Sequence, residues 1–216
     1  LLAKGNTLWF AYARQALKFG LEMLGMGEPD AILVPAYICN VIESPLLSLR
    51  ITPHYYDIKE DLSPDFADIE RRLDRNTKAL LCVNYFGYPA PFEEIRAFCR
   101  SHNLIFIEDN AHGFLSRKGQ DWLGTFGDIS ITSFRKTVPL IHGGLLHISS
   151  KYARDDLDLQ RPNFQRKESN FRYVYRNIKN AVMPLDIYPI NRIRQRVLST
   201  SVVHWGNSPS SQPDSL

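Results

Sequence analysis

Residues 105–144 read IFIEDNAHGFLSRKGQDWLGTFGDISITSFRKTVPLIHGG, and the fold is decided in this stretch. An apolar run at 104–107 leads into a pair of acids, the second of which is Asp109, as in a buried parallel strand that ends at the ligand-binding edge of an α/β protein. A second short strand is predicted at 129–133, and Lys136 follows shortly after it. Because parallel strands end at one edge of a sheet, we expect Lys136 to reach the same crevice as Asp109.

The rest of the chain alternates strand and helix patterns around this stretch. Short apolar runs predict strands at 31–35, 51–58 and 79–84, and helical periodicity predicts helices at 10–24, 41–49 and 92–102. A further helix is predicted to start with Ser63 as its N-cap and Pro64 as its first residue. This alternation indicates an α/β fold of three layers, a mostly parallel central sheet with helices on both faces, in a large domain at 1–150.

Composition narrows the class of protein. The chain has 216 residues with 44% hydrophobic content, which indicates a soluble globular protein with a substantial core. Its net charge of +3 arises after residue 150, but the arginines there are dispersed among tyrosines and acids. This pattern favours a solvated surface or a site for a small anionic group over nucleic-acid binding.

Cysteine usage and hydropathy bear on the compartment. The 3 cysteines are odd in number and lack metal-like spacing, so we expect a reducing cytoplasm and no metal site. Neither a signal peptide nor an apolar run of about 18 residues is present, so the sequence predicts no association with a membrane.

Six motifs, in a fixed order, carry a resemblance to a known family. They are VPAY at 34–37, YYDI at 55–58, NTKALLCVNYFGYP at 76–89, IEDNAHG at 107–113, LGTFGD at 123–128 and RKT…HGG at 135–144. Over about 10–149 the chain resembles the DegT/DnrJ/EryC1/StrS sugar aminotransferases, pyridoxal-phosphate (PLP) enzymes of the aspartate aminotransferase fold (fold type I). The resemblance implies transfer of an amino group from an amino acid, with glutamate expected, to a nucleotide-linked keto sugar in cell-surface polysaccharide or amino-sugar biosynthesis.

The resemblance also assigns catalytic residues. In the family, the acid matching Asp109 bonds the pyridine nitrogen of PLP, and the lysine matching Lys136 holds the cofactor aldehyde and shuttles the proton. His112 lies where relatives carry Gln or His near the ring, and Arg135 faces either solvent or a phosphate. Taken alone, each has a simpler interpretation: Glu108 and Asp109 cap a strand or helix, Lys136 lies on the surface, and His112 is a core residue.

The part of the chain that would bind the phosphate group of the cofactor departs from the family pattern. Most relatives have a Ser-Gly-Thr-like turn there, whereas this chain has Ala13, Arg14 and Gln15. We expect Arg14 to contribute charge and the backbone amides of Arg14 and Gln15 to point at the phosphate. The Ser-x-x-Lys spacing makes Ser133 a further expected phosphate ligand. Tyr37 either stacks on the cofactor or lies buried in the core.

The C-terminal third is the second departure, because relatives continue into a small domain. We interpret 151–200 as a helical segment leading into an incomplete C-terminal domain, with helical patterns at 171–182 and 190–198, and 201–216 as a disordered tail. Family active sites form between two subunits, so a homodimer is expected. The alternative function is a truncated or degenerate member that keeps the fold, and with it the cofactor, without turnover and serves as a partner subunit.

Overall fold

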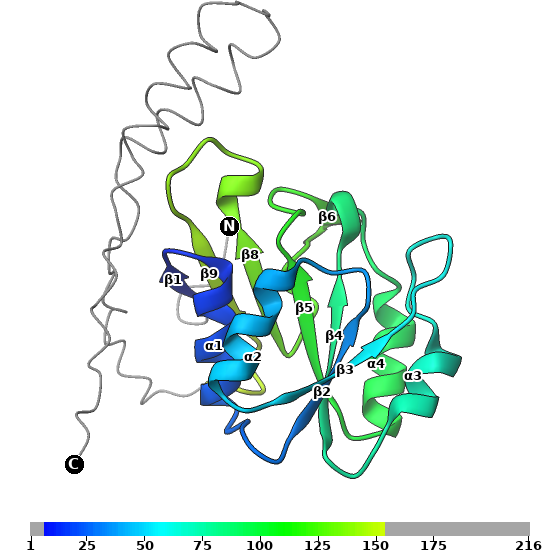
Figure 1. Cartoon of the computed structure of the whole chain (residues 1–216). Coiled ribbons are helices and arrows are strands. Elements are labelled where there is room, and N and C mark those ends of the chain that lie inside the picture. Colours follow the sequence, from blue (N-terminus) through cyan, green and yellow to red (C-terminus); the bar gives the residue numbers. More distant parts are fainter. Residues whose placement is uncertain (1–6, 154–216) are drawn as a thin grey trace, which may run out of the picture. The chain divides into compact units, whose positions relative to one another are not determined.

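The computed structural model describes residues 7–153, which form a seven-stranded sheet with the order β1-β9-β8-β5-β4-β2-β3 (Figure 1). The strands are β1 (Thr7–Phe10), β2 (Ala31–Pro35), β3 (Thr52–Tyr56), β4 (Thr77–Val83), β5 (Ile105–Asn110), β8 (Ile129–Ser133) and β9 (Gly144–Ile148). From β3 to β8 every neighbouring pair is parallel, whereas β9 runs antiparallel to both β8 and β1. A separate hairpin pairs β6 (Arg117–Lys118) with β7 (Asp121–Trp122). The predicted mostly parallel sheet is confirmed.

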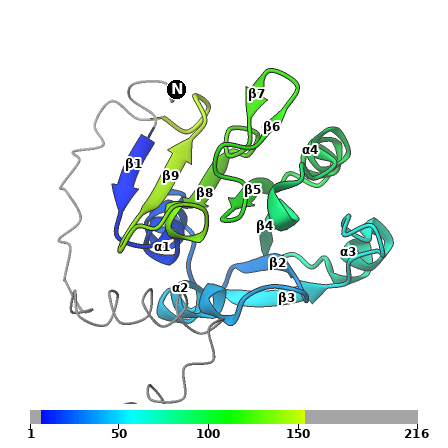
Figure 2. The same cartoon turned by 90° about the horizontal axis from the view of Figure 1, so that it is seen from above.

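Helices cover both faces of the sheet, as Figure 2 shows from above. On one face lie α1 (Ala13–Met23) and α2 (Glu43–Ser48), and on the other lie α3 (Phe66–Arg72) and α4 (Phe92–Ser101). Short 3₁₀ turns occur at η1 (Asn40–Ile42), η2 (Tyr85–Gly87) and η3 (Phe134–Lys136). Successive strand residues serve opposite cores: Val34 packs with Leu17 of α1, whereas Leu33 packs with Ile95 of α4. Burial on both faces explains why these strands read as continuous apolar runs.

Several predicted elements match, and two predicted starts are wrong. Strands β2 and β8 have the predicted bounds. Phe10, predicted as the start of the first helix, belongs to β1 because it pairs with Gly144 of β9. Ser63 is not the N-cap of α3, since Asp65 accepts hydrogen bonds from the first-turn amides of that helix. Pro64 is extended and forms an antiparallel bridge instead.

The strand with the paired acids is longer than predicted. β5 does not stop at the acids but continues to Asn110, because Glu108 and Asp109 lie opposite Ser130 and Ile131 of β8. Strands β1 and β9 were not predicted at all. The acids are therefore inside the sheet, on a strand buried between two neighbours.

Contacts divide the chain into units Leu1–Gln165 and Arg166–Leu216, and every described residue belongs to the first unit. The predicted helical patterns at 171–182 and 190–198 and the predicted tail at 201–216 lie outside the described residues. The domain boundaries remain predictions. Within 7–153, none of the helices combines the length and the apolar character needed to cross a membrane.

Candidate active site

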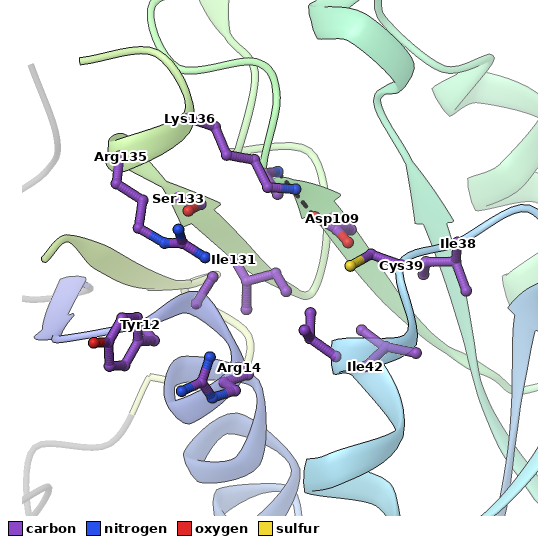
Figure 3. Close-up of a pocket in the computed structure, with 13 residues that line it drawn as sticks. Tyr12, Arg14, Ile38, Cys39, Ile42, Asp109, Ile131, Ser133, Arg135 and Lys136 are labelled. Carbon is purple, nitrogen blue, oxygen red and sulfur yellow. Dashed lines mark hydrogen bonds between the residues drawn. The ribbon is translucent and has the colours of Figure 1, made fainter. Parts of the chain in front are cut away.

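A hollow opens beside the carboxyl ends of β5 and β8, next to the first turn of α1 (Figure 3). Five of its lining residues come from five elements of the chain: Arg14 from α1, Cys39 from the loop after β2, Asp109 from β5, Ser133 from the end of β8, and Lys136 from η3. An adjoining hollow is lined by Tyr37, Tyr85, Phe86 and His112, and it shares Asp109 and Lys136 with the first. The two hollows thus meet at the predicted acid and lysine.

Asp109 is a buried carboxylate with one oxygen left over. Its side chain is 7% exposed, and Oδ1 accepts a hydrogen bond of 2.9 Å from the backbone amide of Ala111. Within residues 7–153 the other oxygen has no hydrogen-bond donor. Burial raises the pKa of Asp109. The Ala111 amide and the positive charge of Lys136 lower it again, but only in part. A cationic partner in the hollow would satisfy both the free oxygen and the charge.

Lys136 and His112 meet above this acid. The Nζ atom of Lys136 lies 3.1 Å from Nε2 of His112. Burial, and then the nearby charge of Lys136, lower the pKa of His112 below its ordinary value, so the neutral ring can accept a hydrogen bond from the amine. Phe86 stacks on the imidazole with its ring centroid 6.1 Å away and an interplanar angle of 9°. The histidine thus fixes the direction in which the lysine points.

The predicted phosphate ligands divide into two groups. Ser133 is 4% exposed and lines the hollow, and Arg14 lines it from α1. Gln15 lines neither hollow, since its Oε1 accepts a hydrogen bond of 3.1 Å from the backbone amide of Tyr12 and so caps the helix. Its side chain is thereby committed to helix α1, and its backbone amide is used as well, because it donates to the carbonyl oxygen of Tyr12 at 3.0 Å.

Tyr37 lies at the mouth of the adjoining hollow. Its side chain is 58% exposed, so the alternative that places it in the core is wrong. The ring stacks on Tyr85 with 5.6 Å between centroids, and the Tyr85 hydroxyl donates to the carbonyl oxygen of Tyr37 at 2.6 Å. These two contacts fix a flat aromatic surface beside Asp109 and His112.

Glu108 supports the site from the opposite face of β5, a role that the sequence did not reveal. It is fully buried, and both of its oxygens only accept hydrogen bonds. The donors are the amides of Gly124 (2.7 Å), Phe126 (2.7 Å) and Gly127 (3.1 Å), the Ser130 hydroxyl (2.9 Å) and the Asn84 amide (2.8 Å). The glycines of the LGTFGD motif are the visible signal, because they free backbone amides to turn toward one acid.

Gly144 explains how α1 reaches the end of β8. A Cβ atom at this position would lie 2.4–2.7 Å from backbone atoms of Tyr12 and Ala13. The neighbouring Gly143 donates its amide hydrogen to the carbonyl oxygen of Ala11 at 2.9 Å. The glycine pair of the HGG motif therefore lets the first turn of α1 lie directly on β9, and this contact places Arg14 in the same hollow as Ser133.

Comparison with known proteins agrees with this geometry. The chain is 36% identical over 145 residues to the GDP-perosamine synthase of Escherichia coli O157:H7, an alignment that covers 65% of this chain and 39% of that protein. The chain thus spans about two fifths of the length of that curated relative. Among solved structures, Helicobacter pylori PseC, an aminotransferase of pseudoaminic acid biosynthesis, matches with 26% identity and a TM-score of 0.62, covering 68% of this chain and 41% of that one.

A second solved structure bears on the fold alone. Spr1654 of Streptococcus pneumoniae, solved in a PLP form, matches with 21% identity and a TM-score of 0.62, covering 69% of this chain and 42% of that one. A model of one protein family also matches this chain, and the aminotransferases of that family are PLP-dependent. That model, described as the DegT/DnrJ/EryC1/StrS aminotransferase family, matches residues 4–172, and the chain belongs to this family.

Proposed function

We propose that this chain forms the PLP site of an aminotransferase that moves an amino group from an amino acid, glutamate by preference, to a nucleotide-linked keto sugar. One observation carries the proposal: the amine of Lys136, the ring of His112 and the buried carboxylate of Asp109 converge on adjoining hollows at the carboxyl edge of the sheet. The likeness to GDP-perosamine synthase supports the sugar substrate.

The residues present fit the cofactor. Asp109 has one oxygen without a donor among residues 7–153, and its pKa is raised because the charge of Lys136 does not offset its burial. A protonated pyridine nitrogen at about 3 Å would attract it by roughly 5 kcal/mol at an effective dielectric of about 20. This attraction would keep the ring nitrogen protonated, a state in which bound PLP would supply a sink for the electrons of a carbanion.

Lys136 and His112 supply the proton chemistry in this proposal. Lys136 Nζ would hold the cofactor through its aldehyde and, when a substrate amine takes its place, would be the base that accepts the proton of the substrate Cα and donates it again. His112 Nε2, kept neutral by its lowered pKa, accepts a hydrogen bond from that amine and orients it. Phe86 holds the imidazole in place by stacking.

We include a homodimer in the proposal, because exposed aromatic side chains lie in the adjoining hollow, at Tyr37 and Phe86, and two residues beyond it, at Tyr88. Tyr37, Phe86 and Tyr88 are 58%, 65% and 76% exposed. Apolar surface gathered beside a site is typical of a face that a partner covers. Sedimentation of the purified chain should give twice the monomer mass, and a monomer at all concentrations would refute this part.

Cofactor attachment is tested directly. The purified chain, incubated with PLP, should turn yellow, and borohydride reduction should leave the cofactor mass on the peptide that contains Lys136. Lys136→Ala should lose both signals, whereas Lys78→Ala, a change at an exposed position of β4, should keep them. A colourless wild type in excess PLP would contradict the proposal.

Turnover needs a second measurement. Addition of glutamate should bleach the yellow colour as the amino group passes to the cofactor, and other amino acids should bleach it more slowly. A chain that binds PLP on Lys136 but bleaches with no amino donor would favour the alternative, a partner subunit that keeps the cofactor without turnover.

A further inference from the structure

Two arginines share one aromatic ring at the end of the main hollow. The Cζ atom of Arg14 lies 4.3 Å from the ring centroid of Tyr12, and that of Arg135 lies 5.8 Å from the same centroid. Figure 3 shows Arg14 reaching from α1 and Arg135 from η3 toward the space beside Tyr12. His142 packs edge-on against this ring, with 5.3 Å between centroids and an interplanar angle of 90°. Tyr12 is thus the element on which both guanidinium groups rest.

The charges at this end of the hollow are unbalanced. Neither Arg14 nor Arg135 forms an ion pair with any carboxylate of residues 7–153. The hollow is lined by these two arginines and Lys136, against the single acid Asp109. Two guanidinium groups held near each other repel, so an anion with two negative charges that binds between them would be favoured.

A buried hydroxyl provides an independent sign of a ligand. Ser133 is 4% exposed and lines the hollow; its backbone pairs with Gly144 of β9, whereas its hydroxyl has no hydrogen-bond partner among residues 7–153. Buried hydroxyl groups are normally paired, so an unpaired one that opens into a hollow points to a ligand acceptor there. In the first turn of α1 the amide of Gln15 donates to the carbonyl oxygen of Tyr12, whereas the amides of Ala13 and Arg14, two residues that line the hollow, have no such acceptor among residues 7–153.

We propose that Tyr12 is a positioning residue whose ring holds Arg14 and Arg135 together, and that this arginine pair, with Ser133, binds the phosphate group of the cofactor. The inference rests on the proposed function and deepens it. Guanidinium groups take a phosphate through two parallel hydrogen bonds each, whereas a turn of hydroxyl groups supplies single donors. Charge on the arginines thus takes over the work of the hydroxyl-bearing turn that this chain lacks.

The test compares PLP with pyridoxal, which lacks the phosphate, as ligands of the full-length chain. Arg135→Met should weaken PLP binding about tenfold or more, as expected for a lost hydrogen bond to a charged group, and should leave pyridoxal binding unchanged. Arg117→Met is the matched control, because the Arg117 guanidinium lies 3.6 Å from the Trp122 ring centroid in the β6–β7 hairpin, outside both hollows.

Tyr12 is tested by a pair of variants. Tyr12→Leu removes the ring and should weaken PLP binding about two- to fivefold, the size expected for exposed cation–π contacts, again without effect on pyridoxal. Tyr12→Phe keeps the ring and should bind PLP like the wild type. Equal losses for PLP and pyridoxal, equal losses in both Tyr12 variants, or a loss in Arg117→Met as large as in Arg135→Met would each overturn the inference.

Inorganic phosphate separates this inference from the proposed function. Phosphorus NMR should detect phosphate binding to the cofactor-free chain and its loss in Arg135→Met. If phosphate binds in this way but PLP never attaches to Lys136, the arginine site stands and the proposed function fails. If PLP attaches to Lys136 but the wild type prefers it no more than pyridoxal, the proposed function stands and the arginine site is refuted.

Discussion

Replacing Glu108 with Gln tests whether this buried carboxylate holds the site together. Five donors converge on its two oxygens, three of them backbone amides of the loop at 124–127. A glutamine amide keeps one acceptor oxygen and puts an NH₂ group where the other oxygen was. In the better orientation, the NH₂ group faces the amides of Gly124 and Asn84, so two buried donors lose their acceptor.

The expected magnitude follows from those two donors. Each buried donor left without an acceptor costs about 1–3 kcal/mol. The lower cost of burying an uncharged amide offsets part of this loss, so we expect Glu108→Gln to lower the free energy of unfolding by about 2–4 kcal/mol. With a urea dependence of about 2 kcal/mol per molar, the midpoint should fall by roughly 1–2 M.

Urea unfolding followed by circular dichroism measures this shift. Glu22→Gln is the control: Glu22 is exposed and its partner Lys18 is 3.5 Å away, so its loss should change the free energy by less than about 0.5 kcal/mol. Hydrogen exchange should also speed up at the amides of 124–127 in Glu108→Gln. A midpoint equal to that of Glu22→Gln, with unchanged exchange in the loop, would refute the role assigned to Glu108.

Three further predictions concern the site. Gly144→Ala should destabilise the fold by about 1–3 kcal/mol in urea unfolding, because its Cβ would meet the backbone of Tyr12, whereas Gly27→Ala meets only an ordinary contact and should not. Burial raises the pKa of Asp109, so its stabilising contribution, present below the ordinary value near 3.8, is lost as the pH rises through the raised pKa. Asp109→Asn should therefore make the cofactor-free chain more stable than the wild type at neutral pH while abolishing the yellow colour. Burial lowers the pKa of His112, so its contribution is present above its ordinary value of 6.5 and lost as the pH falls below it; His112→Gln should lessen the fall in unfolding free energy between about pH 7 and 5.

The parts of the fold that the sequence predicted are those buried on both faces. Strands β2 and β8 are uninterrupted apolar or β-branched runs, and their bounds could be read directly. Strand β1 could not be predicted, because it has only four residues and lies at the edge of the sheet. Strand β9 could not be predicted either, because it begins at Gly144, and a glycine pair indicates a turn unless its contact with Tyr12 is known.

Some residues of the candidate site could likewise be predicted from the sequence, and others could not. Asp109, Lys136 and His112 could be found because their side chains belong to linked motifs. The partners of Glu108 could not, because they are mostly backbone amides whose direction depends on the loop conformation. The place of Tyr12 could not be predicted either, since the two arginines on its ring come from α1 and η3, which meet only in the folded sheet.

The pairing of β1 with β9 bears on how the protein is made. Thr7 lies opposite His147, so the edge strand β1 can pair with β9 only after almost the whole described region has been synthesised. Contacts between residues so distant along the chain form slowly. During translation, Asp109 and then Lys136 leave the ribosome before Gly144 and β9, so the first turn of α1 lacks the strand on which it lies until then. The end of the hollow at Tyr12 is thus among the last features that a nascent chain completes.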